Sequence, residues 1–314
     1  MIILAIVRTD IPTTSRLCEE EILALVERYP FLSTEVLTTT AFGRPVLTLR
    51  IGTGERKVLY SAAHHANEWI TTPVLLKFME ELAQAVESGG RIYGVPAATL
   101  VKGSMIHTVP MVDPDGVDLV TGAIETGTLS YESARRIADR FPDIPFPDGW
   151  KANLLGVDLN LQYPAGWLMA REIKFSQGYT RPAPRDYVGR APLSQRESLA
   201  LARYTEEVDP ALILAYHTQG KVIFWQFQDY VVPGAEELGR EFARLSGYAL
   251  SNVPYESSFA GYKDWFIQSF RRPGYTIECG EGENPLPLEQ FDEIYRDNLG
   301  ILVTAATGLP GIPG

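Results

Sequence analysis

The chain has 314 residues, of which 45% are hydrophobic and 21% are charged, a composition typical of a folded globular protein and not of a disordered one. Lys and Arg total 28 against 39 Asp and Glu, which gives a formal net charge of -11. Such an acidic surface repels phosphate backbones, so no nucleic-acid partner is expected. No apolar run approaches the ~20 residues that a membrane-spanning helix needs.

The N-terminus has no positively charged segment before its apolar run and no small-residue cleavage site, so no secretory signal is predicted. We therefore expect a cytoplasmic protein, with the spore or the cell wall as the alternative location. The two cysteines, Cys18 and Cys279, form no metal-binding pair. We expect both to be small buried apolar residues.

The N-terminal part of the chain alternates helical and extended patterns. Apolar residues with a 3.6-residue period predict an amphipathic helix over 18–29. Strands over 35–41 and 45–51 are expected to form a hairpin. The apolar run 58–63 predicts a buried strand, and the stretch from 72 to 86 predicts a helix.

The middle of the chain is less regular. Residues 104–111 predict a strand that ends in a turn at 113–116. Residues 121–190 are rich in Gly, Pro and Asp, with one helix expected near 131–140. Long irregular stretches inside a compact domain are usually functional loops, and we expect this one to be functional.

The C-terminal third again alternates helices and strands. Its predicted elements are a helix at 192–208, strands at 211–216 and 222–227, a helix at 235–245, a strand at 275–279 and a helix at 288–305. Apolar strands alternating with helices predict an α/β fold in which helices cover a largely buried sheet. No shift in composition divides the chain, so a single domain is expected.

Candidate chemistry centres on the histidines, of which there are only four. His65 and His217 each follow directly on a predicted buried strand, and open α/β sheets bind their ligands at such strand ends. Glu68 lies three residues after His65, and Glu278 lies in the strand at 275–279.

Two imidazoles and a carboxylate are the donors that Zn²⁺ accepts, at about 2.0–2.2 Å. Three protein ligands, His65, Glu68 and His217, would leave a fourth position open, as in catalytic zinc sites. Glu278 is then the candidate to take a proton from a water molecule at that position. A His-x-x-Glu pattern also arises by chance, so the residues alone leave a structural role open.

Other common chemistries have no motif in this chain. The sequence contains no nucleophile elbow of serine hydrolases, no phosphate-binding P-loop and no dinucleotide-binding glycine fingerprint. A serine hydrolase or a nucleotide-dependent enzyme is therefore disfavoured.

Four segments resemble the zinc carboxypeptidase family in order and spacing. They are HHANEWITTP at 64–73, GVDLNLQYPAGW at 156–167, AYHTQG at 215–220 and GYTIECG at 274–280. Within the family, the chain looks most like the bacterial γ-D-glutamyl-L-diamino acid (meso-diaminopimelate) endopeptidases. The resemblance covers roughly residues 12–305.

This resemblance implies a single catalytic domain, residues 1–314, with a mixed, mostly eight-stranded twisted sheet flanked by helices. One zinc ion would be held by His65, Glu68 and His217. Glu278 would act as general base towards the attacking water and then as general acid towards the leaving amine. The family has no ligand position at His64 or His107, which are expected to be structural.

Two departures from the family pattern bear on specificity. Exopeptidases of the family clamp the terminal carboxylate of the substrate with an arginine after the residue matched by Asn160, and this chain has Leu161 there. A second family arginine is replaced by Asn67. Leucine cannot form the charge-assisted pair that a carboxylate clamp needs, so trimming of free C-termini is disfavoured. Asn160 itself is retained as a candidate substrate-binding residue.

Three further residues are candidates through the resemblance. Lys263 matches the floor of the pocket for the leaving-side side chain, where a cation would favour the extra carboxylate of diaminopimelate; a solvated surface lysine is the alternative. Lys151 matches the cation that stabilises the developing oxyanion, with Arg185 and Arg190 as alternatives. Tyr255 matches a mobile-loop tyrosine of the family, or has only a packing role.

The hypothesis from the sequence is a zinc endopeptidase that cuts the γ-D-glutamyl–meso-diaminopimelate bond of peptidoglycan peptides. The alternative is a metallocarboxypeptidase that releases C-terminal residues. A non-catalytic peptide- or wall-binding module is disfavoured, because a binding module has no need of Glu278.

Overall fold

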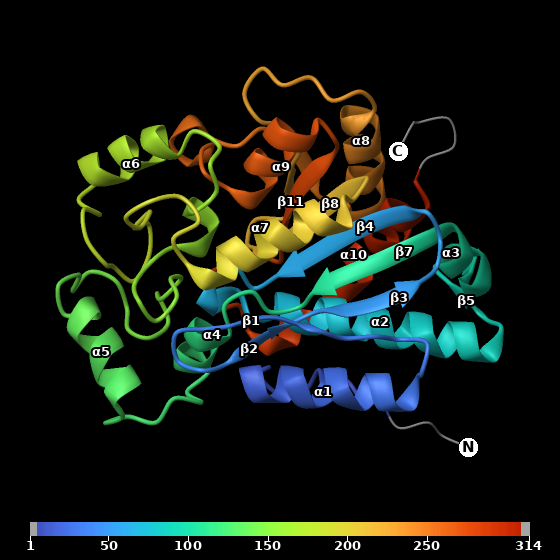
Figure 1. The fold of residues 1–314 in the computed structure, drawn as a ribbon, viewed down its shortest axis with the longest axis horizontal. Helices are drawn as coiled ribbons and strands as arrows, with labels where there is room; N and C mark the ends of the chain where they lie inside the picture. The colour runs from blue at the N-terminus through green and yellow to red at the C-terminus, as the bar shows by residue number, and fades with distance from the viewer. Residues whose placement is uncertain (1–4, 309–314) are drawn as a thin grey trace.

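A seven-stranded mixed sheet forms the centre of the molecule, in the order β10-β9-β11-β8-β4-β7-β3. The computed structural model describes residues 5–308, so the first part of the N-terminal apolar run lies outside the described residues. Helices cover both faces of the sheet, and the long loops with α5 and α6 gather at one end of it (Figure 1).

The strands of this sheet are β3 (Leu49–Gly52), β4 (Arg56–Ala62), β7 (Ser104–Val109), β8 (Leu212–Thr218), β9 (Val222–Phe224), β10 (Ala249–Ser251) and β11 (Gly274–Cys279). Two hairpins lie outside it, β1 (Val36–Thr39) with β2 (Pro45–Leu47), and β5 (Arg91–Ile92) with β6 (Val95–Pro96). The helices are α1 (Ser15–Arg28), α2 (Thr71–Ser88), α3 (Ala97–Gly103), α4 (Pro114–Val120), α5 (Leu129–Ala138), α6 (Trp167–Ser176), α7 (Arg196–Val208), α8 (Ala235–Ser246), α9 (Tyr262–Phe270) and α10 (Phe291–Thr307). Short 3-10 turns are η1 (Ala66–Glu68), η2 (Leu159–Leu161), η3 (Tyr255–Ser257) and η4 (Leu288–Gln290).

The four central strands run parallel. β7 pairs with β4, β4 with β8, and β8 with β11, all in parallel register. Every residue of β8 is buried, as expected for a strand covered on both faces. Because the strands are parallel, their carboxyl ends meet at one edge of the sheet, next to the loops with α5 and α6 (Figure 1).

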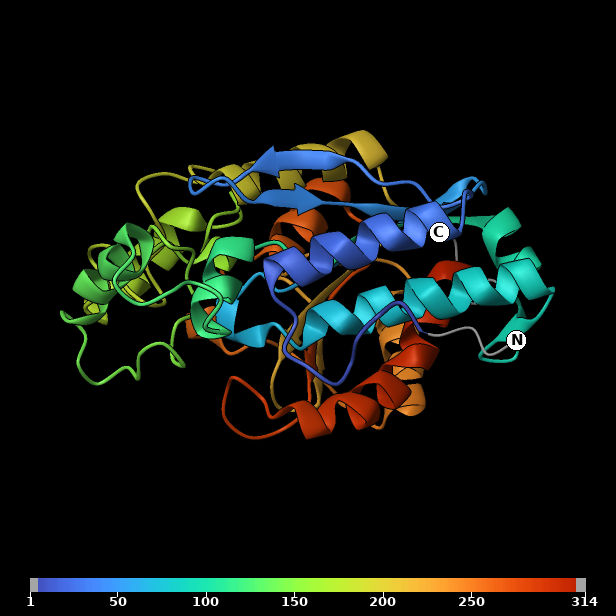
Figure 2. The same cartoon turned by 90° about the horizontal axis from the view of Figure 1, so that it is seen from below.

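Two layers of helices pack on the sheet. α1, α2, α8 and α10 contribute to the core on one face, and α7 and α9 to the core on the other. Figure 2 shows α1 and α2 stacked side by side below the β1–β2 hairpin. Within β4, Val58 and Tyr60 belong to the first core and Leu59 to the second, which is the alternation of a strand with two buried faces.

The expected α/β architecture is confirmed, but the sheet has seven strands in the described residues and not eight. The predicted strand 45–51 divides at Thr48, and only its second half, as β3, joins the main sheet. Its first half pairs with β1 in a separate hairpin. The turn expected at 113–116 is the start of α4, where the Asp113 side chain accepts a hydrogen bond from the Gly116 amide at 3.0 Å.

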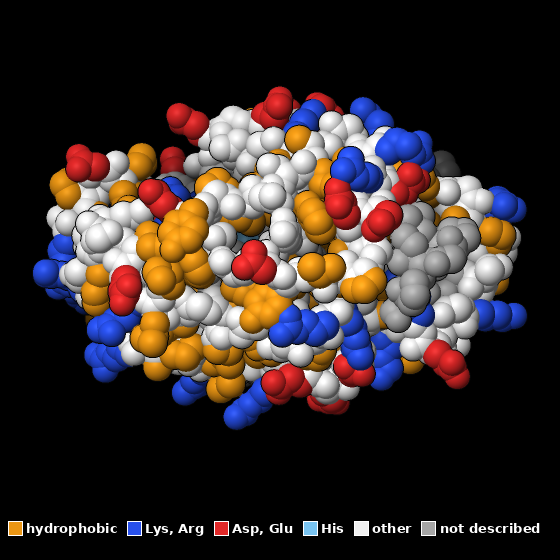
Figure 3. Space-filling view, turned by 90° about the horizontal axis from the view of Figure 1, so that it is seen from above, with side chains coloured by type: hydrophobic (Ala, Val, Ile, Leu, Met, Phe, Trp, Pro, Cys, Tyr) orange, Lys and Arg blue, Asp and Glu red, His pale blue; other side chains and the backbone are white. Residues whose placement is uncertain are grey.

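Three further expectations concern the cysteines, membrane-spanning helices and the charge of the surface. Cys18 and Cys279 are both buried and unpaired, as expected. None of the helices in residues 5–308 is long and apolar enough to cross a bilayer. On the face seen in Figure 3, basic side chains are interspersed with acidic ones, and those described there form no continuous basic area.

Candidate active site

The strand ends bring the predicted site residues together. β4 ends at Ala62, and the chain then turns into η1, which places His65 and Glu68 at the carboxyl edge of the sheet. His217 lies near the end of β8. Glu278 on β11 is the register partner of His217, so the two residues are neighbours on adjacent strands.

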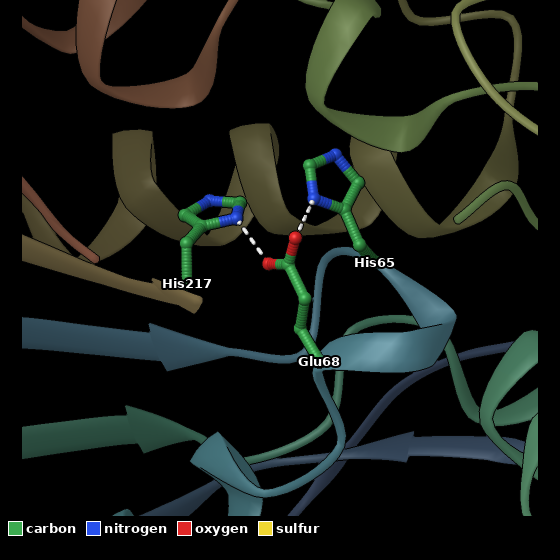
Figure 4. A group of neighbouring side chains, drawn as sticks. All are labelled: His65, Glu68 and His217. Atoms are coloured by element: carbon green, nitrogen blue, oxygen red, sulfur yellow. Dashed lines mark hydrogen bonds and ion pairs between the residues drawn. The ribbon is translucent and has the colours of Figure 1, made fainter. Parts of the chain in front are cut away.

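His65, Glu68 and His217 form a buried cluster in which the carboxylate lies between the two imidazoles (Figure 4). His65 Nδ1 lies 2.9 Å from Glu68 Oε1, and His217 Nδ1 lies 2.8 Å from Glu68 Oε2. One donor atom from each residue lies within 4.8 Å of the other two. Both imidazoles thus turn the same ring nitrogen towards one point.

Asp158, which sequence analysis did not single out, orients His65. Its Oδ1 lies 3.1 Å from His65 Nε2, which leaves Nδ1 to face Glu68. Burial opposes a charged imidazole, but the Glu68 and Asp158 carboxylates outweigh it and raise the pKa of His65 to about 9. The available signal was an acidic residue inside the GVDLN segment, two residues before Asn160.

The cluster fits a divalent metal ion. Burial alone would raise the pKa of Glu68, but His65 and Lys151 hold it well below its usual range, so the carboxylate is ionised. Two imidazole nitrogens and one carboxylate are a common protein ligand set of catalytic zinc.

Lys151 and Glu278 flank this cluster. Lys151 Nζ lies 2.8 Å from Glu68 Oε1, and the charge of Glu68 outweighs the effect of burial and raises the pKa of Lys151. Burial, with the nearby Glu68 charge, raises the pKa of Glu278 above its ordinary value. A carboxylate with a raised pKa is a stronger base, as general acid–base catalysis near neutral pH requires.

A cavity of about 290 Å³ opens beside the cluster, lined among others by Asn160, Leu161, Lys263 and Glu278. We name it the Lys263 cavity. Lys263 is 3% exposed, so it is not a solvated surface lysine. Its ammonium contacts Asp264 Oδ1 and the Gln226 carbonyl oxygen, each at 2.6 Å, which leaves one of its three protons for a ligand.

Asn160 and Leu161 lie in the same cavity. The Asn160 side-chain oxygen accepts a hydrogen bond from the Tyr262 amide at 3.0 Å. Its amide nitrogen has no partner in the described part of the chain and can donate to a substrate. Leu161 offers no charge, as the sequence predicts.

A second cavity of about 820 Å³, the Asn67 cavity, is lined among others by Asn67, Thr218 and Asn284. Asn67 is 3% exposed, and its side-chain oxygen has no hydrogen-bond partner in the part of the chain that the structure describes. The residues that line both cavities are Lys151, Arg185, Phe224 and Glu278. The two cavities therefore meet at the two flanking residues of the cluster.

Three other residues lie outside the cluster. Tyr255 is 63% exposed, does not line the Lys263 cavity, and packs edge-on against Phe259 with ring centroids 5.2 Å apart. His64 is buried beside the Tyr163 hydroxyl, and His107 Nδ1 lies 2.7 Å from the Tyr204 hydroxyl. The structure thus does not bring Tyr255 to the site.

Comparison with known proteins agrees with this geometry. Residues 18–300 match the family model described as zinc carboxypeptidase. The chain is 41% identical over 285 residues to a γ-D-glutamyl-L-diamino acid endopeptidase 1 of Lysinibacillus sphaericus, covering 90% of this chain and 69% of that protein. It is 38% identical over 287 residues to the uncharacterized protein YqgT of Bacillus subtilis strain 168, covering 90% and 74%.

Among solved structures, carboxypeptidase A of Helicoverpa armigera has the same fold, with a TM-score of 0.72, 20% identity, and coverage of 96% of this chain and 75% of that one. The family match spans most of the chain and includes all three members of the metal-binding cluster. The chain therefore belongs to the zinc carboxypeptidase family and is a zinc metallopeptidase.

Proposed function

We propose that this peptidase hydrolyses the γ-D-glutamyl–meso-diaminopimelate bond of peptidoglycan peptides. The observation that carries the proposal is the Lys263 cavity, where a buried cation faces a space that also contains the uncharged Leu161. Lys263, although paired with Asp264, keeps one N–H for an acidic leaving-side side chain, and Leu161 offers no charge. The 41% identity to a γ-D-glutamyl-L-diamino acid endopeptidase supports the same substrate.

In this proposal, His65, Glu68 and His217 hold the single zinc ion. When bound, the ion supplies Lewis acidity next to the scissile carbonyl. Asp158 holds the His65 ring so that Nδ1 faces the cluster. These residues fix the position of the reacting centre.

The proton steps fall to Glu278. Its carboxylate accepts a proton from the attacking water and then donates it to the leaving amine. Lys151, whose ammonium lies beside the cluster, stabilises the carbonyl oxygen as it gains negative charge. Asn160 donates a hydrogen bond to the leaving group from the Lys263 cavity.

A metallocarboxypeptidase that releases C-terminal residues is the alternative function. The overall likeness to carboxypeptidase A is a likeness of fold. Leu161 and Asn67 stand where exopeptidases of the family have arginines, which disfavours recognition of a terminal carboxylate.

The expected cytoplasmic location, with the spore or cell wall as the alternative, stays a prediction.

Defined peptides test the function directly. The zinc-loaded enzyme should cleave L-alanyl-γ-D-glutamyl-meso-diaminopimelate at the γ-glutamyl bond, and should still do so when the peptide continues beyond diaminopimelate. Product analysis by mass spectrometry identifies the bond. No cleavage there, together with rapid release of residues from blocked dipeptides that stops when their C-termini are amidated, would favour the carboxypeptidase.

Substitution Glu278→Gln should lower turnover by about 10²- to 10⁴-fold because the amide cannot accept the proton. The zinc content, measured by inductively coupled plasma mass spectrometry, should stay at one ion per chain. Glu281→Gln, an exposed change three residues away, is the matched control and should keep full turnover. Near-normal turnover of the first variant would remove Glu278 from the mechanism.

Substitution Asp158→Asn should weaken zinc binding by about 10- to 100-fold, because His65 loses the carboxylate that orients and polarises its ring. Competition with a zinc chelator measures the affinity. Asp143→Asn, on an exposed loop, serves as the control. Equal zinc affinity in the two variants would show that Asp158 does not support the metal ligand.

Substitution Lys263→Met should reduce selectivity for diaminopimelate. The measured quantity is the ratio of kcat/KM for γ-D-glutamyl-diaminopimelate to that for γ-D-glutamyl-L-lysine, which lacks the extra carboxylate. Loss of one buried charge-assisted contact should lower this ratio by about tenfold to a hundredfold. Partial unfolding would lower both rates by the same factor and leave the ratio unchanged. The exposed control Lys102→Met should leave both the rates and the ratio unchanged. An unchanged ratio in Lys263→Met would contradict the assignment.

A further inference from the structure

We propose that Arg185 is a substrate-binding residue whose guanidinium binds the free α-carboxylate of the γ-linked glutamyl residue, on the acyl side of the scissile bond. The inference rests on the function proposed above and names a recognition element for it. It starts from the position of Arg185, which lines both the Lys263 cavity and the Asn67 cavity together with Glu278.

The backbone around Arg185 is tied to the flank of the metal-binding cluster. The Pro184 carbonyl oxygen accepts hydrogen bonds from the backbone amides of Lys151 and Ala152, at 2.8 and 2.9 Å. Pro184, the residue before Arg185, therefore lies against the segment that contains Lys151, the candidate for stabilising the oxyanion. Movement of Arg185 relative to the reacting centre is limited by these bonds.

The side chain of Arg185 is held from one end. Its Nε donates to Asp186 Oδ2 at 2.8 Å, and Lys174 Nζ contacts the other Asp186 oxygen at 2.6 Å. The Asp186 amide donates to Asp158 Oδ2 at 3.3 Å, and the other oxygen of Asp158 contacts His65. One carboxylate, Asp158, thus fixes both the metal ligand and the residue that anchors the guanidinium.

The other end of the guanidinium is available to a ligand. Within residues 5–308, neither Nη atom of Arg185 has a hydrogen-bond partner, and the side chain is 40% exposed. Burial disfavours the charge, but Asp186 outweighs it and raises the pKa of Arg185. The coplanar N–H groups of a guanidinium can donate two parallel hydrogen bonds to the two oxygens of one carboxylate.

The charge pattern of the Asn67 cavity places the carboxylate on the acyl side. The Lys263 cavity is the proposed leaving-side pocket, so the Asn67 cavity is left for the acyl side. Its two basic residues are Lys151 and Arg185. Lys151 contacts Glu68, whereas within residues 5–308 the Nη atoms of Arg185 have no hydrogen-bond partner. The acids that line this cavity are the proposed general base Glu278 and two exposed residues, Asp148 and Glu283.

Substrate chemistry explains why a cation is useful there. In an ordinary peptide the acyl-side residue has no free α-carboxylate, because that group forms the scissile bond. In a γ-linked glutamyl residue the α-carboxylate is free and lies a short aliphatic chain away from the scissile carbonyl. A charged guanidinium at that distance separates γ-linked from α-linked substrates.

A pair of matched peptides tests the inference. L-Alanyl-γ-D-glutamyl-meso-diaminopimelate is compared with the same peptide in which the α-carboxylate of the glutamyl residue is amidated. The zinc-loaded enzyme should prefer the free acid in kcat/KM, and Arg185→Ala should reduce that preference by about tenfold to a hundredfold. Arg181→Ala, an exposed change in the same segment, should keep the preference of the unaltered enzyme. Arg185→Lys keeps the positive charge but cannot form the bidentate hydrogen bonds of a guanidinium, so its preference for the free acid should lie between those of the unaltered enzyme and Arg185→Ala.

The outcomes separate the two proposals. If the unaltered enzyme cleaves neither peptide, the proposed function fails. If it cleaves both and Arg185→Ala lowers both rates by the same factor, Arg185 acts on the chemical step or the fold, and the inference is overturned. It is also overturned if the ratio changes only when the leaving-side carboxylates are amidated instead.

Discussion

The carboxylate of Glu68 between two imidazoles is the interaction on which the rest of the site depends. Its two oxygens face Nδ1 of His65 and Nδ1 of His217, at 2.9 and 2.8 Å. An ionised carboxylate in a buried place is costly unless it is paired, and here three cationic or metal-binding groups surround it. The arrangement exists because parallel strands β4 and β8 end at the same edge of the sheet.

The same edge accounts for the shape of the substrate site. Two cavities meet at Lys151, Arg185 and Glu278, and in the proposed function each receives one side of the bond to be cut. The charges in these pockets differ from the pattern expected of an exopeptidase, because Lys263 supplies the cation and Leu161 does not. In the proposed function, specificity thus depends on Lys263 in α9 and Leu161 in η2, whereas the reacting centre lies at the carboxyl ends of the strands.

The sequence predicted the reacting centre better than its surroundings, for a physical reason. His65, His217 and Glu278 lie on or directly after buried parallel strands, and apolar runs in the sequence predict where such strands end. The roles of these residues as zinc ligands and general base were assigned through the resemblance to the family. Asp158 and Arg185 lie between 121 and 190, where no periodicity constrains the backbone. Their places depend on tertiary hydrogen bonds that leave no local pattern. The count of eight strands, which the resemblance to the family implied, was wrong, since the sheet has seven strands within residues 5–308.

The central claim is that one zinc ion is bound where His65, Glu68 and His217 converge. Anomalous diffraction from a zinc-loaded crystal, recorded on both sides of the zinc absorption edge, measures this directly. The account predicts one peak per chain, about 2.0–2.2 Å from both Nδ1 atoms and a Glu68 oxygen. A peak elsewhere, or no peak at this cluster at stoichiometric zinc, would contradict it.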